Sequence, residues 1–149
     1  MPQPPDAATA ATTRDLLAYL TLLRTAGVGP ARLRRLLQRF GDAVAVLAAG
    51  PSAWRDSGCS DAQIAALASP DHAGGEADLR WLDASDHHHH VRPGDARYPA
   101  RLAEIASAPL GLFLIGDPAC LAEPQLAIVG ARAASVQGRE NAAHFAGAL

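Results

Sequence analysis

Several residue types are scarce in this 149-residue sequence, and each scarcity narrows the class of protein. Lysine is absent, so the thirteen basic residues are all arginine, and fifteen acidic residues bring the formal net charge to −2. A chain with this balance is not a polycation that binds nucleic acid over its whole surface. The two cysteines, Cys59 and Cys120, lie far apart in unlike contexts, which favours a reduced, cytoplasmic protein over a disulfide scaffold.

Long apolar runs are also missing. No run approaches the roughly 20 residues of a transmembrane helix, and the N-terminus lacks the charged and apolar regions of a signal peptide. No membrane partner is therefore expected. Catalytic constellations are missing too, because Ser135 has no evident His and Asp partners and neither cysteine has a neighbouring base. The sequence predicts no enzyme activity and no cofactor.

Hydrophobic periodicity predicts a helical first part over residues 11–85, after a Pro- and Ala-rich tail (1–10) that we expect to be disordered. The predicted helices share start and stop residues typical of helix ends. They begin near Thr12 or Thr13, at Pro30, after Asp42, at Pro51, after the capping-box sequence Ser60–Gln63, and at Glu76, the last following a loop over Asp71–Gly75. This part reads as a bundle of short helices.

The pattern changes near residues 84–87, where we place a domain boundary. Residues 86–149 alternate between strand-like and helix-like segments, which is typical of an α/β domain. The expected strands are 90–92, 110–115 and Leu126–Val129, and the expected helices follow Tyr98-Pro99, cover 118–123 and start at Val136.

A small-residue loop joins the last expected strand to the last expected helix. Gly130 and Gly138 bound this loop, and Arg132 and Ser135 lie inside it. A strand, a loop and a helix N-terminus form a frequent anion-binding device, because backbone N–H groups and the helix dipole favour negative charge. The loop is not a dinucleotide fingerprint, since arginine occupies position 132, where G-x-G-x-x-G needs a glycine.

A second candidate site is the segment Gly27-Val28-Gly29, which joins two expected helices as a helix-hairpin-helix element. Its backbone N–H groups could contact a DNA phosphate without reading sequence. Five arginines surround it, and no acidic residue occurs between Asp15 and Asp42. They are Arg24, Arg32, Arg34, Arg35 and Arg39. The alternative is a turn between two helices with the arginines as a solvated face.

The run His87–His90 is a third feature. Adjacent histidines on a strand alternate faces, so at most two could ligate one metal ion, and no Cys or His follows at a metal-ligand spacing. We interpret the run as a solvated linker and predict no metal site.

The order of the motifs resembles the DNA-processing protein A family (DprA, also called Smf). The resemblance rests on a helical module with Gly27-Val28-Gly29, followed by segments 94–99 (GDARYP), 112–117 (LFLIGD) and 127–132 (AIVGAR). It implies a sterile-alpha-motif-like (SAM-like) helical domain followed by a Rossmann-like domain. It also implies single-stranded DNA binding, loading of the RecA recombinase, protection of incoming DNA in natural transformation, and a homodimer for the full-length family.

By the same resemblance, Gly130, Arg132 and Ser135 would hold a DNA phosphate, with Gly138 closing the loop. Two positions depart from the family pattern. Ala131 stands where the family usually has serine, which removes a hydroxyl donor, and Gln137 stands where it has tyrosine, which removes an aromatic ring.

The chain stops at Leu149, within the last expected helix, so we expect a truncated start of the Rossmann-like domain. From this we expect weak binding of single-stranded DNA and no RecA loading. Two other function classes stay open. One is a structural or protein-interaction module with incidental DNA contact, and the other is a fragment of a nucleotide-handling Rossmann-like enzyme.

Overall fold

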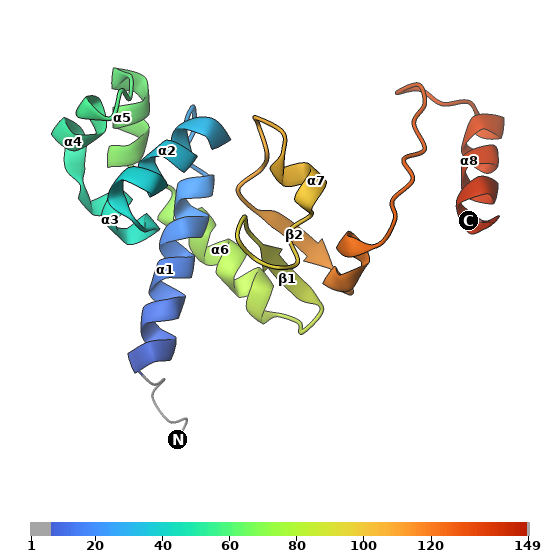
Figure 1. Cartoon of the computed structure of the whole chain (residues 1–149), viewed down its shortest axis with the longest axis horizontal. Coiled ribbons are helices and arrows are strands. Elements are labelled where there is room, and N and C mark those ends of the chain that lie inside the picture. Colours follow the sequence, from blue (N-terminus) through green and yellow to red (C-terminus); the bar gives the residue numbers. More distant parts are fainter. Residues whose placement is uncertain (1–6, 149) are drawn as a thin grey trace.

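Helices dominate the first part of the chain in the computed structural model, which describes residues 7–148 and their side chains from Thr12 onward (Figure 1). The helices are α1 (Ala7–Leu23), α2 (Pro30–Phe40), α3 (Ala43–Ala48), α4 (Gly50–Asp56), α5 (Asp61–Ala68) and α6 (His72–Asp83). Residues 1–6 of the predicted tail lie outside the described residues. Its last four residues, 7–10, begin α1, so this helix starts earlier than the predicted Thr12 or Thr13.

The predicted helix ends are largely confirmed. Gly41 ends α2 with a left-handed φ of 95°, and its N–H donates to the Leu37 carbonyl. The Asp42 carboxylate then accepts from the Ala45 N–H at 2.7 Å and caps α3. Ser60 and Gln63 form the predicted capping box at α5, so each satisfies a backbone donor of the other.

The predicted loop over Asp71–Gly75 is wrong, because α6 already begins at His72. The Asp71 carboxylate caps the helix by accepting from the Gly74 N–H at 2.9 Å. Gly75 is buried where α6 packs on α1, and a Cβ there would lie 3.2 Å from the Thr21 Cα. The paired glycines therefore allow two helices to approach closely, rather than forming a turn.

The core of the helical part is built from the buried faces of α1 to α5. Its buried members in α1 to α5 include Leu22, Leu33, Leu36, Val46, Trp54, Ile64 and Leu67. The indole Nε1 of Trp54 donates to the Val46 carbonyl at 2.8 Å, so the one polar atom of this large side chain is satisfied inside the core.

The second part consists of β1 (His88–Val91), α7 (Ala100–Ala103), β2 (Leu112–Ile115), the short 3₁₀ helix η1 (Pro118–Ala122) and α8 (Val136–Ala148). β1 and β2 pair antiparallel, with His88 opposite Ile115 and Val91 opposite Leu112. The parallel sheet of a Rossmann-like domain is not formed among residues 7–148. None of the described helices is both long and apolar enough to cross a membrane.

The predicted strand Leu126–Val129 is wrong, since the segment has no regular secondary structure. A strand exists through hydrogen bonds to a neighbour, and within the described residues β2 pairs only with β1. The apolar side chains of this segment are accordingly exposed, with Val129 at 89% and Leu126 at 70%.

The two parts share one core across the predicted boundary at 84–87. Leu110, from the second part, is 5% exposed and belongs to the helical core cluster. The Tyr19 hydroxyl of α1 donates to the Leu110 carbonyl at 2.7 Å. At the junction itself, the Trp81 ring at the end of α6 stacks on His88 with a centroid distance of 4.0 Å. The β1–β2 hairpin is therefore packed on the helices rather than tethered to them.

Candidate nucleic-acid interface

The loop predicted to bind phosphate leads directly into α8, as expected. The Ser135 hydroxyl accepts from the Gly138 N–H at 3.1 Å and caps the first turn of the helix. Arg139 in α8 donates to the Ala134 carbonyl at 2.9 Å, which ties the end of the loop to the helix. The Ser135 oxygen therefore has a structural partner already, while its hydroxyl hydrogen is available to donate to an anion.

Arg132 is exposed in this loop, and its guanidinium has no hydrogen-bond or ion-pair partner among residues 7–148. Gly130 is exposed as well, with no atom within 4 Å of the position of a Cβ. The loop thus offers an uncommitted positive charge beside bare backbone and a helix N-terminus, a combination suited to a phosphate.

The helix-hairpin-helix element is present between α1 and α2. Gly27 adopts a left-handed φ of 72°, which favours glycine. Gly29 is the N-cap of α2 and provides no side-chain cap, and Pro30 follows as the first helical residue. No side chain therefore accepts from the first backbone N–H groups of α2. A phosphate that contacts the backbone here needs these donors to be uncapped.

A second hairpin, residues 57–60 between α4 and α5, lies beside the first, an arrangement that sequence reasoning missed. Arg32 donates to the Ser57 carbonyl at 2.8 Å, and the Gln63 amide donates to the Gly27 carbonyl at 2.9 Å. Gly58 repeats the left-handed conformation of Gly27, with φ of 77°. A glycine in each turn was a signal, but only the fold could show that the two turns are adjacent.

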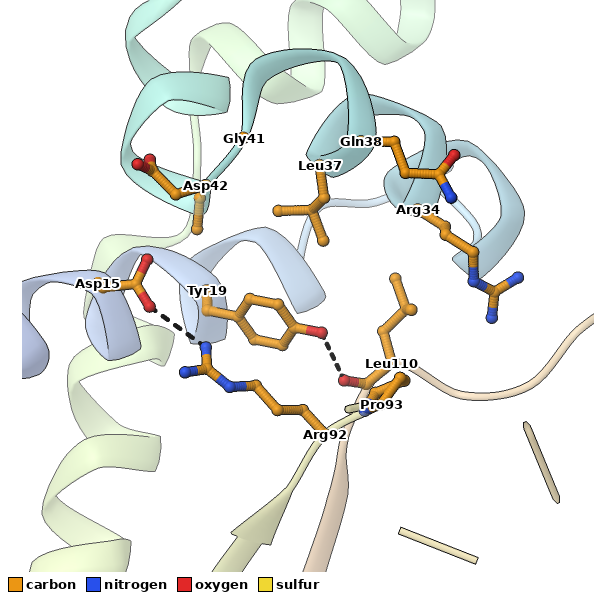
Figure 2. A pocket seen from close by; sticks show the side chains of 11 residues that line it. Asp15, Tyr19, Arg34, Leu37, Gln38, Gly41, Asp42, Arg92, Pro93 and Leu110 are labelled. Atoms are coloured by element: carbon orange, nitrogen blue, oxygen red, sulfur yellow. Dashed lines mark hydrogen bonds and ion pairs between the residues drawn. The ribbon is translucent and has the colours of Figure 1, made fainter. Parts of the chain in front are cut away.

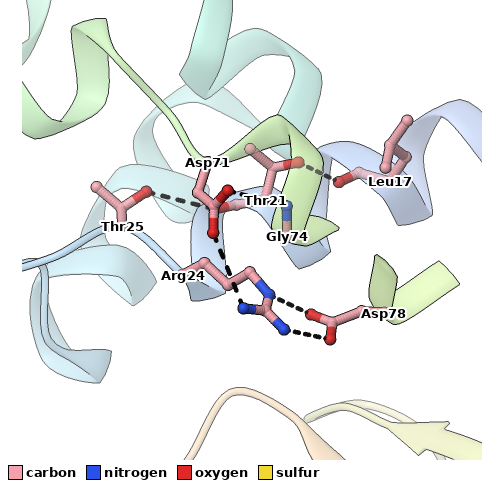
Figure 3. A network of polar contacts seen from close by, with 7 residues as sticks. All are labelled: Leu17, Thr21, Arg24, Thr25, Asp71, Gly74 and Asp78. Atoms are coloured by element: carbon pink, nitrogen blue, oxygen red, sulfur yellow. Dashed lines mark hydrogen bonds and ion pairs between the residues drawn. The ribbon is translucent and has the colours of Figure 1, made fainter. Parts of the chain in front are cut away.

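Most arginines near the hairpin serve the fold. Arg24 forms two 2.6 Å hydrogen bonds with the Asp78 carboxylate and lies 3.8 Å from Asp71, which joins α1 to α6 (Figure 3). The hydrogen bond with Asp78 raises the pKa of Arg24. Arg34 donates to the Ala108 carbonyl at 3.1 Å.

The remaining two arginines of the cluster differ from each other. Arg39 donates to the Asp56 carbonyl at 3.2 Å. Arg35 is exposed, and the described part of the chain provides no partner for it. The predicted contacts Arg32, Arg34 and Arg35 are therefore not equivalent, and Arg35 is the guanidinium most accessible to DNA.

The structure does not bring the two predicted sites together. α8 and the loop before it stand apart from the helical bundle that carries the hairpins (Figure 1). None of the main packing contacts between elements involves α8.

A cleft that the sequence did not predict lies between the two parts (Figure 2). Its volume is about 480 Å³, and residues from α1, α2, the α2–α3 turn and the second part line it. The Arg92 guanidinium covers the Tyr19 ring at 5.1 Å and pairs with Asp15 at 3.2 Å. Burial raises the pKa of Tyr19, so its hydroxyl stays a neutral donor to Leu110.

The histidine run is not the predicted solvated linker, because His88–Val91 forms β1. The His88 ring stacks on Trp81, and its Nδ1 lies 2.6 Å from the Trp81 carbonyl. His90 faces Tyr19 and Phe113, and its Nε2 is buried without a partner. Over the described residues, no three metal-ligating side chains gather in a group that could hold a metal ion.

Two family models match the chain. Residues 13–77 match a model described as the DprA-like N-terminal HHH domain, which covers the two hairpins and their helices. Residues 89–149 match a model described as DNA recombination-mediator protein A, which covers the β-hairpin, the loop and α8. No curated protein sequence matches the chain.

Proposed function

Since the chain belongs to the DprA family of DNA recombination mediators, we propose that it binds single-stranded DNA weakly, as part of a protein that assists RecA loading during natural transformation. The observation that carries this proposal is the uncommitted Arg132 guanidinium, exposed on the loop that enters α8. We also propose that residues 86–149 belong to a Rossmann-like domain. Gly130 would then present its backbone N–H and Ser135 its hydroxyl hydrogen beside Arg132, while the Gly138 N–H holds the Ser135 oxygen.

Single-strand binding can be tested with a fluorescently labelled oligothymidylate, by anisotropy over a range of salt concentrations. Arg132→Ala should weaken binding and reduce the slope of log K against log salt by about 1, because one phosphate contact is lost. Arg101→Ala is the matched control, since Arg101 is also exposed and lies on α7, away from the loop. Equal effects of the two variants would contradict a phosphate site at Arg132.

The helical part gives a second, weaker contact in this proposal, through the hairpin Gly27–Gly29 and Arg35. Reversing the charge of all three predicted arginines would not be a clean test, because Arg32 and Arg34 hold backbone carbonyls. Arg35→Glu alone leaves those contacts intact. It should lower DNA affinity several-fold with unchanged helicity, relative to Arg101→Glu.

The rival function, a protein-interaction or structural module, makes the opposite prediction for the same variants. If Arg35→Glu and Arg132→Ala both leave DNA retention unchanged, contact with DNA is incidental and the rival is favoured. An enzyme that handles nucleotides would need acidic catalytic residues near the loop, and the only carboxylate on α8 is the exposed Glu140.

A further inference from the structure

An apolar groove lies on the helical part of the chain, between α1, α3 and the start of α6, and has a volume of about 350 Å³. Leu17, Ala18 and Thr21 line it from α1, and Val44 and Leu47 line it from α3. Ala18 and Thr21 are buried, whereas Leu17, Val44 and Leu47 are partly exposed. The groove therefore has small side chains at its base and larger apolar side chains along its walls, which leaves apolar surface in contact with water.

The polar side chains that line the groove are either basic or already bonded. Arg14 shares a face of α1 with Leu17 and Thr21, and His72 lies at the start of α6. Both residues are exposed, and neither side chain has a hydrogen-bond or ion-pair partner within the described chain. The Thr21 hydroxyl, in contrast, donates to the Leu17 carbonyl at 2.8 Å. The groove thus presents uncommitted nitrogen donors at its rim and apolar surface inside.

No carboxylate offsets this basic rim among the described residues that line the groove. The acidic neighbours in sequence are engaged elsewhere, since Asp15 pairs with Arg92 at 3.2 Å. Asp71 accepts from the Gly74 N–H and lies 3.8 Å from Arg24 (Figure 3). The local charge is therefore positive although the net charge of the chain is −2, and it favours an acidic ligand over a basic one.

The form of the groove indicates the kind of acidic ligand. No aromatic ring lines it, so it provides no surface on which the bases of a nucleic acid could stack. Helices alone line it, so an extended peptide would find no strand edge to pair with. A groove between helices suits the apolar face of another helix, and the face of α1 from Arg14 to Thr21 is about 10 Å long, or two helical turns.

We propose that this groove binds an acidic amphipathic helix of a partner protein. Apolar side chains of the partner, spaced i, i+3, i+4 and i+7, fill the space between Leu17 and Leu47, and acidic side chains beside them meet Arg14 and His72. The inference goes beyond the proposed function, because the groove shares no residue with the Arg132 loop or the Gly27–Gly29 hairpin.

The test is an NMR titration of the ¹⁵N-labelled chain with three synthetic peptides of about 16 residues, roughly four helical turns. The first has leucines at the i, i+3, i+4 and i+7 positions, flanked by glutamates. The second has lysine in place of each glutamate, and the third has the composition of the first in an order without an apolar face. We expect the first peptide to shift the amide signals of Leu17, Val44 and Leu47 at lower concentrations than the other two.

Two variants locate the contact. Arg14→Glu should weaken binding of the acidic peptide about five- to tenfold and strengthen binding of the lysine peptide, because an attraction becomes a repulsion. Arg101→Glu, the same change at an exposed position on α7, is its control. Ala48→Glu places a carboxylate in the groove lining from an exposed position of α3 and should also weaken the acidic peptide. Its control is Ala65→Glu, exposed on α5 outside the groove.

Any of four results would overturn the proposal: no binding of the acidic peptide, equal binding of the acidic and lysine peptides, shifts outside the groove, or unchanged affinity in both groove variants. Circular dichroism of each variant shows that the helices are intact. Anisotropy with single-stranded DNA on the same samples separates the two proposals. Groove shifts without DNA binding refute the single-strand function alone, and DNA binding that depends on Arg132 without groove shifts refutes the docking site alone.

Discussion

At the scale of single residues, the arginines of the helical part show how a positive cluster can serve mainly the fold. Arg24 joins α1 to α6 through Asp78, Arg32 joins the two hairpins, and Arg34 holds the segment before β2. Each guanidinium is fixed by an acceptor of defined geometry, which limits its freedom to follow a DNA backbone. Arg35 and Arg132 are the residues of this type that remain uncommitted among those predicted to contact DNA.

His90 makes stability depend on pH. Burial lowers the pKa of His90 below its ordinary value of 6.5, and the positive charge of Arg92 lowers it further, while Asp78 opposes the shift. Its ring lies among Tyr19 and Phe113, where a charged imidazolium would lack a partner for Nε2. The unfolded chain therefore takes up a proton more readily, and the free energy of unfolding should fall as pH drops below about 6.5.

Urea unfolding at pH 7.5 and at pH 5.5 measures this effect. The variant His90→Leu should lose less stability between the two pH values than the original chain, because it lacks the buried imidazole. The other histidines are the same in both proteins, so the difference reports on His90. Parallel losses in both proteins would show that His90 does not carry the dependence.

At the scale of elements, the start of α6 depends on close packing. Gly75→Ala should destabilise the protein, although alanine favours helix by about 1 kcal/mol over glycine. The new methyl group would be forced against Thr21 of α1, and overpacking of this kind costs about 1–3 kcal/mol. Chemical denaturation should show a net loss of up to about 2 kcal/mol.

Gly147→Ala is the control for this prediction. Gly147 is also helical, in α8, and no atom lies within 4 Å of the position of its Cβ. This variant should be neutral or slightly more helical. A stabilised Gly75→Ala variant would contradict close contact between α6 and α1.

At the scale of the whole molecule, the helices and the β-hairpin should unfold together, because they share a core. Tyr19→Phe removes the hydroxyl that reaches Leu110 and leaves a buried carbonyl unpaired, a loss of about 1–3 kcal/mol. Hydrogen exchange should show protection falling equally in α3 and β2. Tyr98→Phe, which breaks a 2.6 Å bond to the Pro109 carbonyl within the second part, is the comparison.

A different outcome would contradict a shared core. If Tyr19→Phe loosened only the β2 amides and left α3 protected, the two parts would be separate folding units. The buried position of Leu110 in the helical core argues for the cooperative result.

Local features of this protein were determined by sequence alone. The caps at Asp42 and Ser60, the hairpin at Gly27 and the start of α8 at Val136 depend on backbone preferences and on side chains within a few residues. These interactions are the same wherever the segment lies in the fold, so pattern reasoning predicted them. The same holds for the loop that contains Arg132.

Tertiary structure alone decided whatever depends on residues distant in sequence. Gly74 and Gly75 resemble a loop until α1 packs against them, and Leu126–Val129 resembles a strand but has no strand to pair with in the described chain. The cleft beside Tyr19 exists because residues about 90 positions apart meet there. Such contacts depend on how whole faces pack, which no local pattern encodes.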